Sequence, residues 1–413
     1  MSKIKKENQI LIMLAFFSIS MGLWKNFRQL WLQANSFTAT NISNILSIGT
    51  LASVFGILLV GKYIKLKNLK SFITCSLLIK FINLIFLLNL NNTINTFFIN
   101  ISIIIDVVTG YIITTSVYPL ITTIVKNNTI YSKRKLTEYL FQDIGILIGG
   151  LLIGKNIAGL LVNYNVCLLI SIIFLGFSII FMVNMTACKS IEDKKEDKTS
   201  TLKVILKSKL QTVYMVYTFV GATAFSTALG LKMLTFTNHF NFTDSTATNY
   251  LLIIGLLADV IGILALKYLT PKNDYVTIFI KFGIRCIVYA IAFFANNIVF
   301  SLIAITWSLL ISTSYENIAD GYYINNISSE YQLRYTNLRY TIKYLGEALG
   351  IFLCGVMYEK GLRYMLGLSS LFVSIQIGIA YYLIYIRKSK LNTKNYVAEK
   401  SEILVGEKYG TRN

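Results

Sequence analysis

Twelve apolar stretches, each of about 20 residues, follow one another along this chain of 413 residues. A helix rises about 1.5 Å per residue, so each stretch is long enough to cross the roughly 30 Å hydrocarbon core of a bilayer. A soluble core would account for one or two such stretches but not for all of them. We therefore expect an all-α membrane protein with 12 transmembrane helices. The expected spans are roughly 9–33, 41–63, 71–90, 97–125, 138–162, 165–187, 210–235, 246–270, 275–296, 298–320, 336–358 and 362–386.

The composition agrees with this fold class. Hydrophobic residues make up 55% of the chain and charged residues only 14%, whereas about a quarter of a typical soluble protein is charged. The chain has only two prolines, so its long helices seldom meet a residue that breaks them.

Positive charges exceed negative charges by 20, a balance that would suit a protein that binds nucleic acid. Their distribution indicates a membrane topology instead. Lys and Arg concentrate in the two terminal tails and in alternate loops, whereas the other loops contain only Lys155, Lys360 and Arg363. Basic residues beside spans favour the cytoplasmic side. We therefore expect a multi-pass protein of the cell membrane with both termini in the cytoplasm, in contact with the lipid bilayer and not with nucleic acid.

Three segments occur twice, in the same order and 205 to 208 positions apart. They are GTLASVFGIL (49–58) and GLLADVIGIL (255–264), TATN (38–41 and 246–249), and YLFQDIGILIGG (139–150) and YLGEALGIFLCG (344–355). This spacing is half the chain length, which indicates two parallel copies of one half-protein. The 12 helices are therefore expected to form two pseudo-symmetric six-helix bundles. Membrane transporters often place their substrate path between such repeats.

A long polar interval separates the sixth span from the seventh and contains the mixed-charge run EDKKEDKTS. Such a run is typical of a solvated linker. The expected domains are an N-terminal six-helix bundle at 1–187, a cytoplasmic linker at 188–209, a C-terminal six-helix bundle at 210–386 and a cytoplasmic tail at 387–413.

This arrangement resembles the major facilitator superfamily, whose members have twelve spans, two parallel halves and a central cytoplasmic linker. The family signature after the second span is Gly-x-x-x-Asp-Arg/Lys-x-Gly-x-Arg/Lys, and residues 61–70 here are GKYIKLKNLK. Gly61 and Lys70 match this signature. Lys65 replaces the aspartate and Asn68 the second glycine, so the resemblance is to a divergent member. It implies that the two halves rock about a central substrate cavity that helix 1 helps to line.

Charged residues within spans are the candidate functional residues, because an ionisable group in hydrocarbon is costly unless it is paired or hydrated. Helix 1 contains the run WKNFR, in which Lys25 and Arg28 share a face. Together with Trp24 and Asn26, they are predicted to line the substrate cavity, as the resemblance implies for helix 1. The alternative is that Lys25 and Arg28 reach the outer interface, with Trp24 and Trp31 in an aromatic belt.

Asp106 lies near the middle of the fourth span, and its possible partners are Lys25, Arg28 and Lys80. It is predicted to line the cavity and to carry a proton. A permanent salt bridge with one of these cations is the alternative.

Three further carboxylates are predicted to couple transport to protons. Asp259 stands where the first copy of its repeated segment has Ser53. Asp143 and Glu347 lie in the two copies of another segment, at positions that do not match in charge. A coupling site requires such a difference between the halves. Asp259 is otherwise expected to form a structural ion pair with Arg285 of the next span.

Other charges lie towards the cytoplasmic ends of the tenth and eleventh spans. Glu316, Arg339 and Lys343 are predicted to form an ion-pair network that closes the inner mouth and breaks on opening. Arg339 and Lys343 are four residues apart and therefore lie on one face of their helix.

These features predict a secondary active transporter that moves a small organic solute by alternating access. The sequence has no Gly-x-x-x-x-Gly-Lys-Ser/Thr motif, so protons rather than ATP are the expected energy source. The run GILIGGLLIG (145–154) resembles the antiporter motif of drug exporters, which favours proton-coupled export. A proton-coupled nutrient importer is one alternative, and a non-transporting receptor or scaffold is another.

The sequence does not predict an enzyme. Its one histidine and five cysteines show neither the spacing of metal ligands nor a catalytic pattern. We expect no metal, no other cofactor and a monomeric protein.

Overall fold

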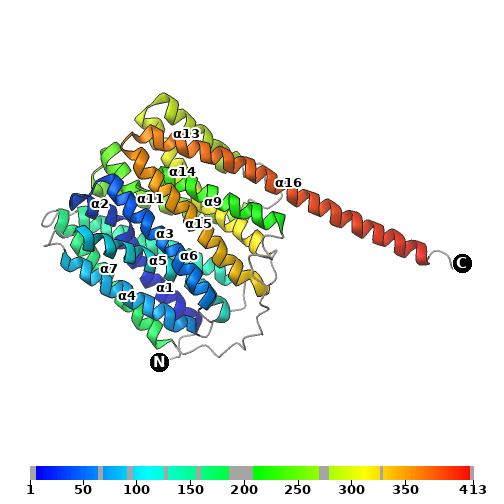
Figure 1. Cartoon of the computed structure of the whole chain (residues 1–413), viewed down its shortest axis with the longest axis horizontal. Coiled ribbons are helices and arrows are strands. Elements are labelled where there is room, and N and C mark those ends of the chain that lie inside the picture. Colours follow the sequence, from blue (N-terminus) through cyan, green and yellow to red (C-terminus); the bar gives the residue numbers. More distant parts are fainter. Residues whose placement is uncertain are drawn as a thin grey trace.

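The computed structural model describes residues 6–63, 68–90, 96–124, 129–154, 160–185, 208–268, 279–325 and 329–409. Within these ranges the chain forms helices and no strand (Figure 1). Helices occupy every one of the spans expected from the sequence. The expected all-α fold is confirmed.

The N-terminal half comprises α1 to α7, and its first span is divided in two. Its helices are α1 (Lys6–Lys25), α2 (Phe27–Ala34), α3 (Ala39–Tyr63), α4 (Leu69–Asn89), α5 (Thr96–Ile124), α6 (Thr129–Gly154) and α7 (Leu160–Asn184).

The C-terminal half comprises α9 to α16, and its first span is divided as well. It contains α9 (Lys209–Leu229), α10 (Lys232–Leu234) with a π-helical turn (Thr235–His239), α11 (Asp244–Tyr268), a second π-helical turn (Phe279–Gly283) leading into α13 (Ile284–Ala295), α14 (Ile298–Asn325), α15 (Ser329–Tyr358) and α16 (Leu362–Tyr409).

Large apolar side chains cover the outside of the bundle. Phe55 on α3 is 62% exposed, Ile82 on α4 is 65% exposed and Leu371 on α16 is 64% exposed. Water disfavours such a surface, whereas lipid chains do not. Within the described ranges, nine helical segments are long and apolar enough to cross a bilayer. The chain is therefore a multi-pass membrane protein.

The packing of the helices repeats from one half to the other. α1 packs against α6 in the first half, and α9 packs against α15 in the second. Between the halves, α3 packs against α15 and α6 against α11 (Figure 1). The repeated segments lie on α3, α6, α11 and α15, so all four helices between the halves carry the sequence repeat.

Glycines allow the closest helix crossings in both halves. Gly22 of α1 faces Gly145 of α6, where an added Cβ would overlap the carbonyl oxygen of Ile19. In the second half, a Cβ at Gly350 of α15 would lie 2.6 Å from the carbonyl oxygen of Thr223. Gly145 and Gly350 are equivalent in the repeat. Close packing of small residues between membrane helices therefore accounts for the glycine run of α6.

The first helix of each half breaks at a matching place without a proline. α1 gives way to α2 at Asn26, and α9 gives way to α10 after Gly230. Gly230 lies against α15, where a Cβ would be 3.2 Å from the Cα of Ile351. A break leaves backbone groups without helical partners. Gln29 of α2 supplies partners across the halves: its Nε2 donates to the carbonyl of Gly230 (2.9 Å), and its Oε1 accepts from the N–H of Met233 (3.3 Å).

Contacts between the halves close the end of the bundle opposite the start of α1, called here the far side. Gln33 donates to the side-chain oxygen of Asn238 at 3.2 Å. Thr40 donates to Glu359 at 2.5 Å. These contacts and those of Gln29 lie at the same end of the bundle, where they link the two halves.

Replacing Gln29 by leucine is expected to favour opening on the far side. The change removes both hydrogen bonds to the break between α9 and α10, and a buried group left unsatisfied costs about 1–3 kcal/mol. We expect the far-side-open population to rise about tenfold. The measurement is the rate at which a membrane-impermeant thiol reagent modifies Leu229→Cys from the far side, in a background without the native cysteines.

Gln33→Leu is the matched control for this variant. Gln33 lies one turn further along α2, and its hydrogen bond is exposed to solvent. A hydrogen bond of this kind contributes about 0.5 kcal/mol or less. We therefore expect its loss to change the modification rate less than about twofold. Equal rates for Gln29→Leu and the unmodified background would contradict a closing role for Gln29.

α16 continues beyond the expected membrane span. It runs to Tyr409, so the described part of the tail is helical and projects from the bundle (Figure 1). The tail after Ile386 contains no proline and is rich in Lys and Glu, which favour helix. The residues between 186 and 207 lie outside the described ranges, and the domain bounds given above remain predictions.

Candidate substrate cavity

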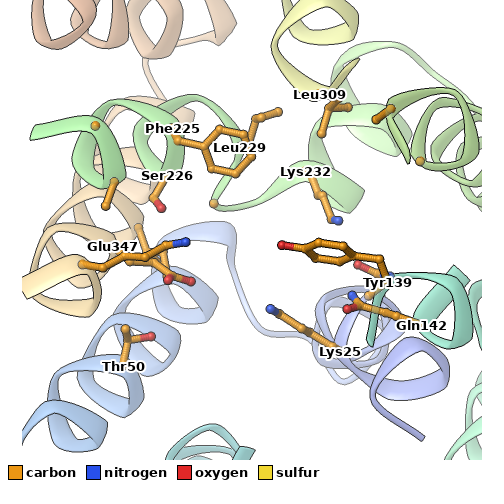
Figure 2. A pocket seen from close by; sticks show the side chains of 18 of the residues that line it. Lys25, Thr50, Tyr139, Gln142, Phe225, Ser226, Leu229, Lys232, Leu309 and Glu347 are labelled. Carbon is orange, nitrogen blue, oxygen red and sulfur yellow. The ribbon is translucent and has the colours of Figure 1, made fainter. Parts of the chain in front are cut away.

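A cavity of about 430 Å³ lies between the two halves (Figure 2). Its wall includes residues from α1, α2, α3, α5 and α6 of the first half. Residues from α9, α10, α11, α13, α14, α15 and α16 of the second half complete it. This size is within the range of sites for small molecules.

The described part of the wall has more positive than negative side chains. Seven cationic residues line it: Lys25, Arg28, Lys232, Lys281, Arg285, Arg339 and Lys343. Three anionic residues line it: Asp143, Asp259 and Glu347. The described wall is therefore strongly cationic.

Aromatic rings lie beside several of these cations. The Lys25 ammonium is 5.8 Å from the centre of the Tyr111 ring. The guanidinium of Arg339 is 5.9 Å from the ring of Tyr214. Such contacts stabilise a cation in a partly dry environment by about 0.5–2 kcal/mol.

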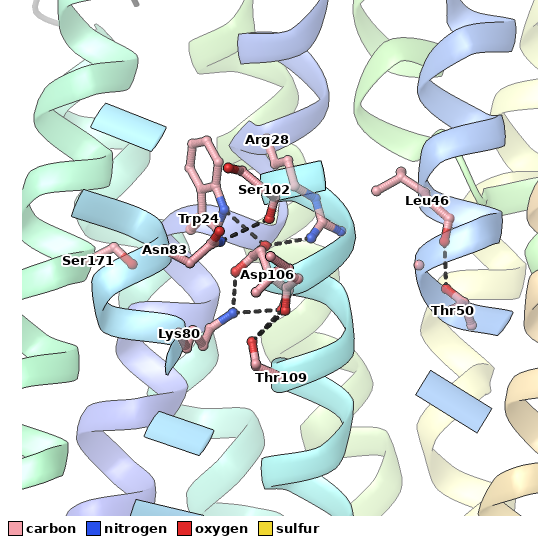
Figure 3. A network of polar contacts seen from close by, with 12 residues as sticks. Trp24, Arg28, Leu46, Thr50, Lys80, Asn83, Ser102, Asp106, Thr109 and Ser171 are labelled. Carbon is pink, nitrogen blue, oxygen red and sulfur yellow. Dashed lines mark hydrogen bonds and ion pairs between the residues drawn. The ribbon is translucent and has the colours of Figure 1, made fainter. Parts of the chain in front are cut away.

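Asp106 lies behind the wall in a closed network (Figure 3). Its side chain is 2% exposed, and its Oδ2 accepts from Arg28 at 2.8 Å. Lys80 of α4 pairs with Oδ1 and also donates to the Asp106 carbonyl at 3.0 Å. Trp24 donates its indole N–H to Oδ2 at 3.1 Å. Two of the three partners expected for Asp106 are present, and this geometry favours the permanent salt bridge over the proton carrier.

The outer-interface alternative for helix 1 is wrong. Trp24 is 1% exposed and Trp31 is 0% exposed, and their rings are 5.8 Å apart inside the bundle. Arg28 is held by the buried Asp106 and does not extend to the interface. Lys25, Asn26 and Arg28 line the cavity, and their role towards a substrate remains a prediction. Trp24 and Asp106 are not part of its described wall and support it from behind.

Asp143 and Asp259 share one wall, where α6 meets α11. They are close enough to interact electrostatically, and Lys232 also acts on Asp143. Gly255 makes room for the Asp143 side chain, because a Cβ at this position would lie 3.1 Å from Oδ1. The glycine of the repeated segment thus gives α6 space for a carboxylate.

The expected ion pair between Asp259 and Arg285 is not formed among the described residues. Both side chains line the cavity. Arg285 instead donates to the carbonyl of Ser308 on α14, at 3.2 Å. Asp259 lies on the side of the cavity that α6 and α11 share, so similar depth in adjacent spans does not bring the two charges into contact.

Glu347 connects the halves on the opposite side of the cavity. Its Oε1 accepts a hydrogen bond from the hydroxyl of Tyr111 on α5. The Tyr111 ring packs 4.2 Å, centre to centre, from that of Tyr344. A carboxylate of the second half is thereby held by a side chain of the first.

The comparisons with known proteins are clear only at the level of structure. No family model matches the chain, and no curated protein matches its sequence. The nucleoside transporter NupG superposes with a TM-score of 0.65 at 13% identity, over 93% of this chain and 100% of that one. The transporter FucP, in its outward conformation, superposes with a TM-score of 0.66 at 13% identity, over 93% of this chain and 99% of that one.

A bacterial homologue of the human lysosomal transporter Spinster, inward-facing and unoccupied, gives a TM-score of 0.68 at 10% identity, over 92% of this chain and 96% of that one. FucP is itself described as a major facilitator superfamily transporter. This chain has the major facilitator fold. At such low identity the likeness shows the fold and not the substrate.

Within this major facilitator fold, the sequence prediction missed Lys232. It is the first residue of α10, after the break that follows α9, and it lines the same cavity as Lys25, the last residue of α1 (Figure 2). The two lysines are 207 positions apart, within the offsets of the sequence repeat. That offset is the signal that would have identified Lys232 from Lys25.

The structure describes only part of the ion-pair network predicted at the inner mouth. Arg339 and Lys343 of α15 line the cavity. The side chain of Glu316 lies outside the described residues, so the network itself remains a prediction.

Proposed function

We propose that the chain is a secondary active transporter that moves a small organic solute by alternating access. The observation that carries this proposal is the cavity between the two halves, whose wall combines ionisable and aromatic side chains from both. The fold supports it, because similar structures include a nucleoside transporter and a fucose:proton symporter.

Protons are the proposed driving ion, and Asp143, Asp259 and Glu347 are the proposed coupling residues. Each lines the cavity, where solvent can deliver a proton. Glu347 contacts Tyr111 of the other half, and Asp143 lies against α11 of the other half. Protonation of either carboxylate changes a contact between the halves. Asp106 lacks this access, so we assign it a structural role.

The sequence prediction of export depended on the glycine run of α6. Helix packing accounts for these glycines, so the proposal includes both an exporter and an importer. The sign of the proton-driven flux distinguishes the two.

The test is flux through the purified protein in proteoliposomes, with a panel of anionic, neutral and cationic solutes. We expect an imposed pH gradient to drive at least one solute against its concentration gradient, and a protonophore to abolish this movement. Binding without flux for every solute would favour the receptor alternative. Solute movement unaffected by the pH gradient would remove the proton from the proposal.

Glu347→Gln and Asp143→Asn are expected to uncouple transport from protons. A gradient of one pH unit is worth about 1.4 kcal/mol per proton and can support about tenfold accumulation. An amide cannot carry the proton. A variant that lacks the coupling group should therefore equalise the solute concentration across the membrane without accumulating it, while movement of the solute down its own concentration gradient continues. Glu359→Gln changes an exposed carboxylate outside the cavity and keeps an oxygen acceptor for Thr40, so it is the matched control and should keep accumulation. Full accumulation by both cavity variants would contradict these assignments.

A further inference from the structure

Lys25 and Lys232 flank the breaks in the first helices of the two halves and face the same part of the cavity. In Figure 2 both side chains extend into the same cavity, with the Tyr139 ring of α6 drawn between them. Lys232 interacts electrostatically with both Lys25 and Asp143. Two cations, one from each half, therefore act on each other within one cavity.

Neither lysine forms an ion pair with the residues that the structure describes. The Lys25 ammonium lies over the ring of Tyr111. Among the carboxylates that act on Lys25, Glu347 has the largest electrostatic effect, and Glu347 accepts a hydrogen bond from the Tyr111 hydroxyl. Lys80 shows the contrast, because it is locked to Asp106 outside the cavity. Cations in a membrane interior normally have a counter-charge, and the cavity can receive one from a ligand.

Asn26, beside Lys25, has a buried hydrogen-bond donor without a partner among the described residues. It lines the cavity next to Lys25, is 3% exposed, and its Nδ2 has no hydrogen-bond partner. A buried donor without an acceptor is uncommon and costs about 1–3 kcal/mol. An acceptor held between the lysines would satisfy it.

We propose that Lys25, Lys232 and Asn26 bind the anionic oxygens of an organic substrate, so that the transported solute is a small organic anion. That the bound anion is transported rests on the proposed transport function. The anion-binding site itself is inferred from the side chains alone. The surplus of cations on the described wall attracts such a solute, and the aromatic side chains pack against its apolar part. A solute held by both lysines connects the two halves near the helix breaks.

Protonation of the carboxylates that act on the two lysines would favour anion binding at the same site. Glu347 acts on Lys25, and Asp143 acts on Lys232, each from the opposite half. Other charges that act on this group are Arg28, Asp259, Lys343 and Glu138. A carboxylate that gains a proton no longer competes with the substrate for its lysine. The anion and the proton are therefore expected to bind together.

The test measures the thermal unfolding of the detergent-solubilised full chain with matched compounds. Carboxylates such as benzoate and succinate are compared with benzamide and succinamide, and phenyl phosphate distinguishes phosphate from carboxylate. We expect at least one anion, and not its neutral partner, to raise the unfolding temperature. Lys25→Gln and Lys232→Gln should each weaken that anion's apparent binding about tenfold to a hundredfold, the range for a lost charge-assisted hydrogen bond.

Two further variants separate binding from folding. Lys25→Arg keeps the charge and should retain most of the anion effect. Lys360→Gln removes an exposed lysine outside the cavity and should bind as the unmodified protein does. The proposal is overturned if no anion stabilises the protein, if anions and amides act equally, or if the two glutamine variants bind anions normally.

The flux assay distinguishes failure of this site from failure of the transport function. Flux of neutral or cationic solutes that survives in both lysine variants would overturn the anion site and leave transport intact. Anion binding that needs both lysines, without flux of any solute, would support the site and contradict transport.

Discussion

Replacing Asp106 by asparagine is expected to destabilise the folded protein by about 3–5 kcal/mol. The amide keeps the shape of the side chain but removes the only carboxylate that the described residues offer to Arg28 and Lys80 at this point. Both cations are then left in the interior without a counter-charge, with Lys80 1% exposed. The indole N–H of Trp24 keeps an oxygen acceptor, so the loss is one of charge. Unfolding in mixed micelles on addition of SDS measures the change in free energy.

Two companions of this variant make the test specific. Asp106→Asn combined with Lys80→Met should recover part of the stability, because an apolar side chain replaces one unpaired cation. Asp143→Asn changes a carboxylate on the cavity wall, where water reaches it, and should change stability by less than about 1 kcal/mol. If Asp106→Asn were as stable as the unmodified protein, the network would not be a structural element. The double variant should also retain proton-driven flux, because we assign Asp106 a structural role and not a coupling role.

Replacing Gly145 by valine is expected to abolish most of the folded protein. An added Cβ at this position overlaps the carbonyl oxygen of Ile19 and lies 3.0 Å from the Cα of Gly22. These are backbone atoms, so no side-chain rotation relieves the overlap and α1 and α6 must move apart. Overpacking of this kind costs about 3 kcal/mol or more. The measurement is the yield of monodisperse protein after solubilisation, together with its unfolding temperature.

Gly378→Val is the matched control for Gly145→Val. Gly378 lies on α16, and a Cβ there would meet no atom within 4 Å. This substitution is expected to change stability by about 0.5 kcal/mol or less. Equal yields for the two variants would show that the crossing of α1 and α6 tolerates a wider spacing than the structure has.

The predicted Asp259–Arg285 pair shows where sequence reasoning is weakest. Depth along a span follows from counting residues, because every helical residue advances the chain by the same distance. The direction in which a side chain points depends on the rotation of its helix. Lipid-facing and buried faces of a membrane helix are both apolar, so hydropathy gives little information about rotation. Arg285 accordingly turned towards Ser308 and not towards Asp259.

The sequence by itself determined the helical membrane fold, the number of spans and the internal repeat, because hydrocarbon thickness fixes the length of an apolar helix and duplication leaves matching letters. It also indicated that Asp106 either carries a proton or pairs with a cation, since a lone charge is too costly in that environment. Only the tertiary structure decided that Arg28 and Lys80 together meet this need, and that Lys25 remains in the cavity opposite Lys232. The relative positions of residues 207 positions apart depend on how the two halves pack, and that packing is a property of the whole bundle and not of any one span.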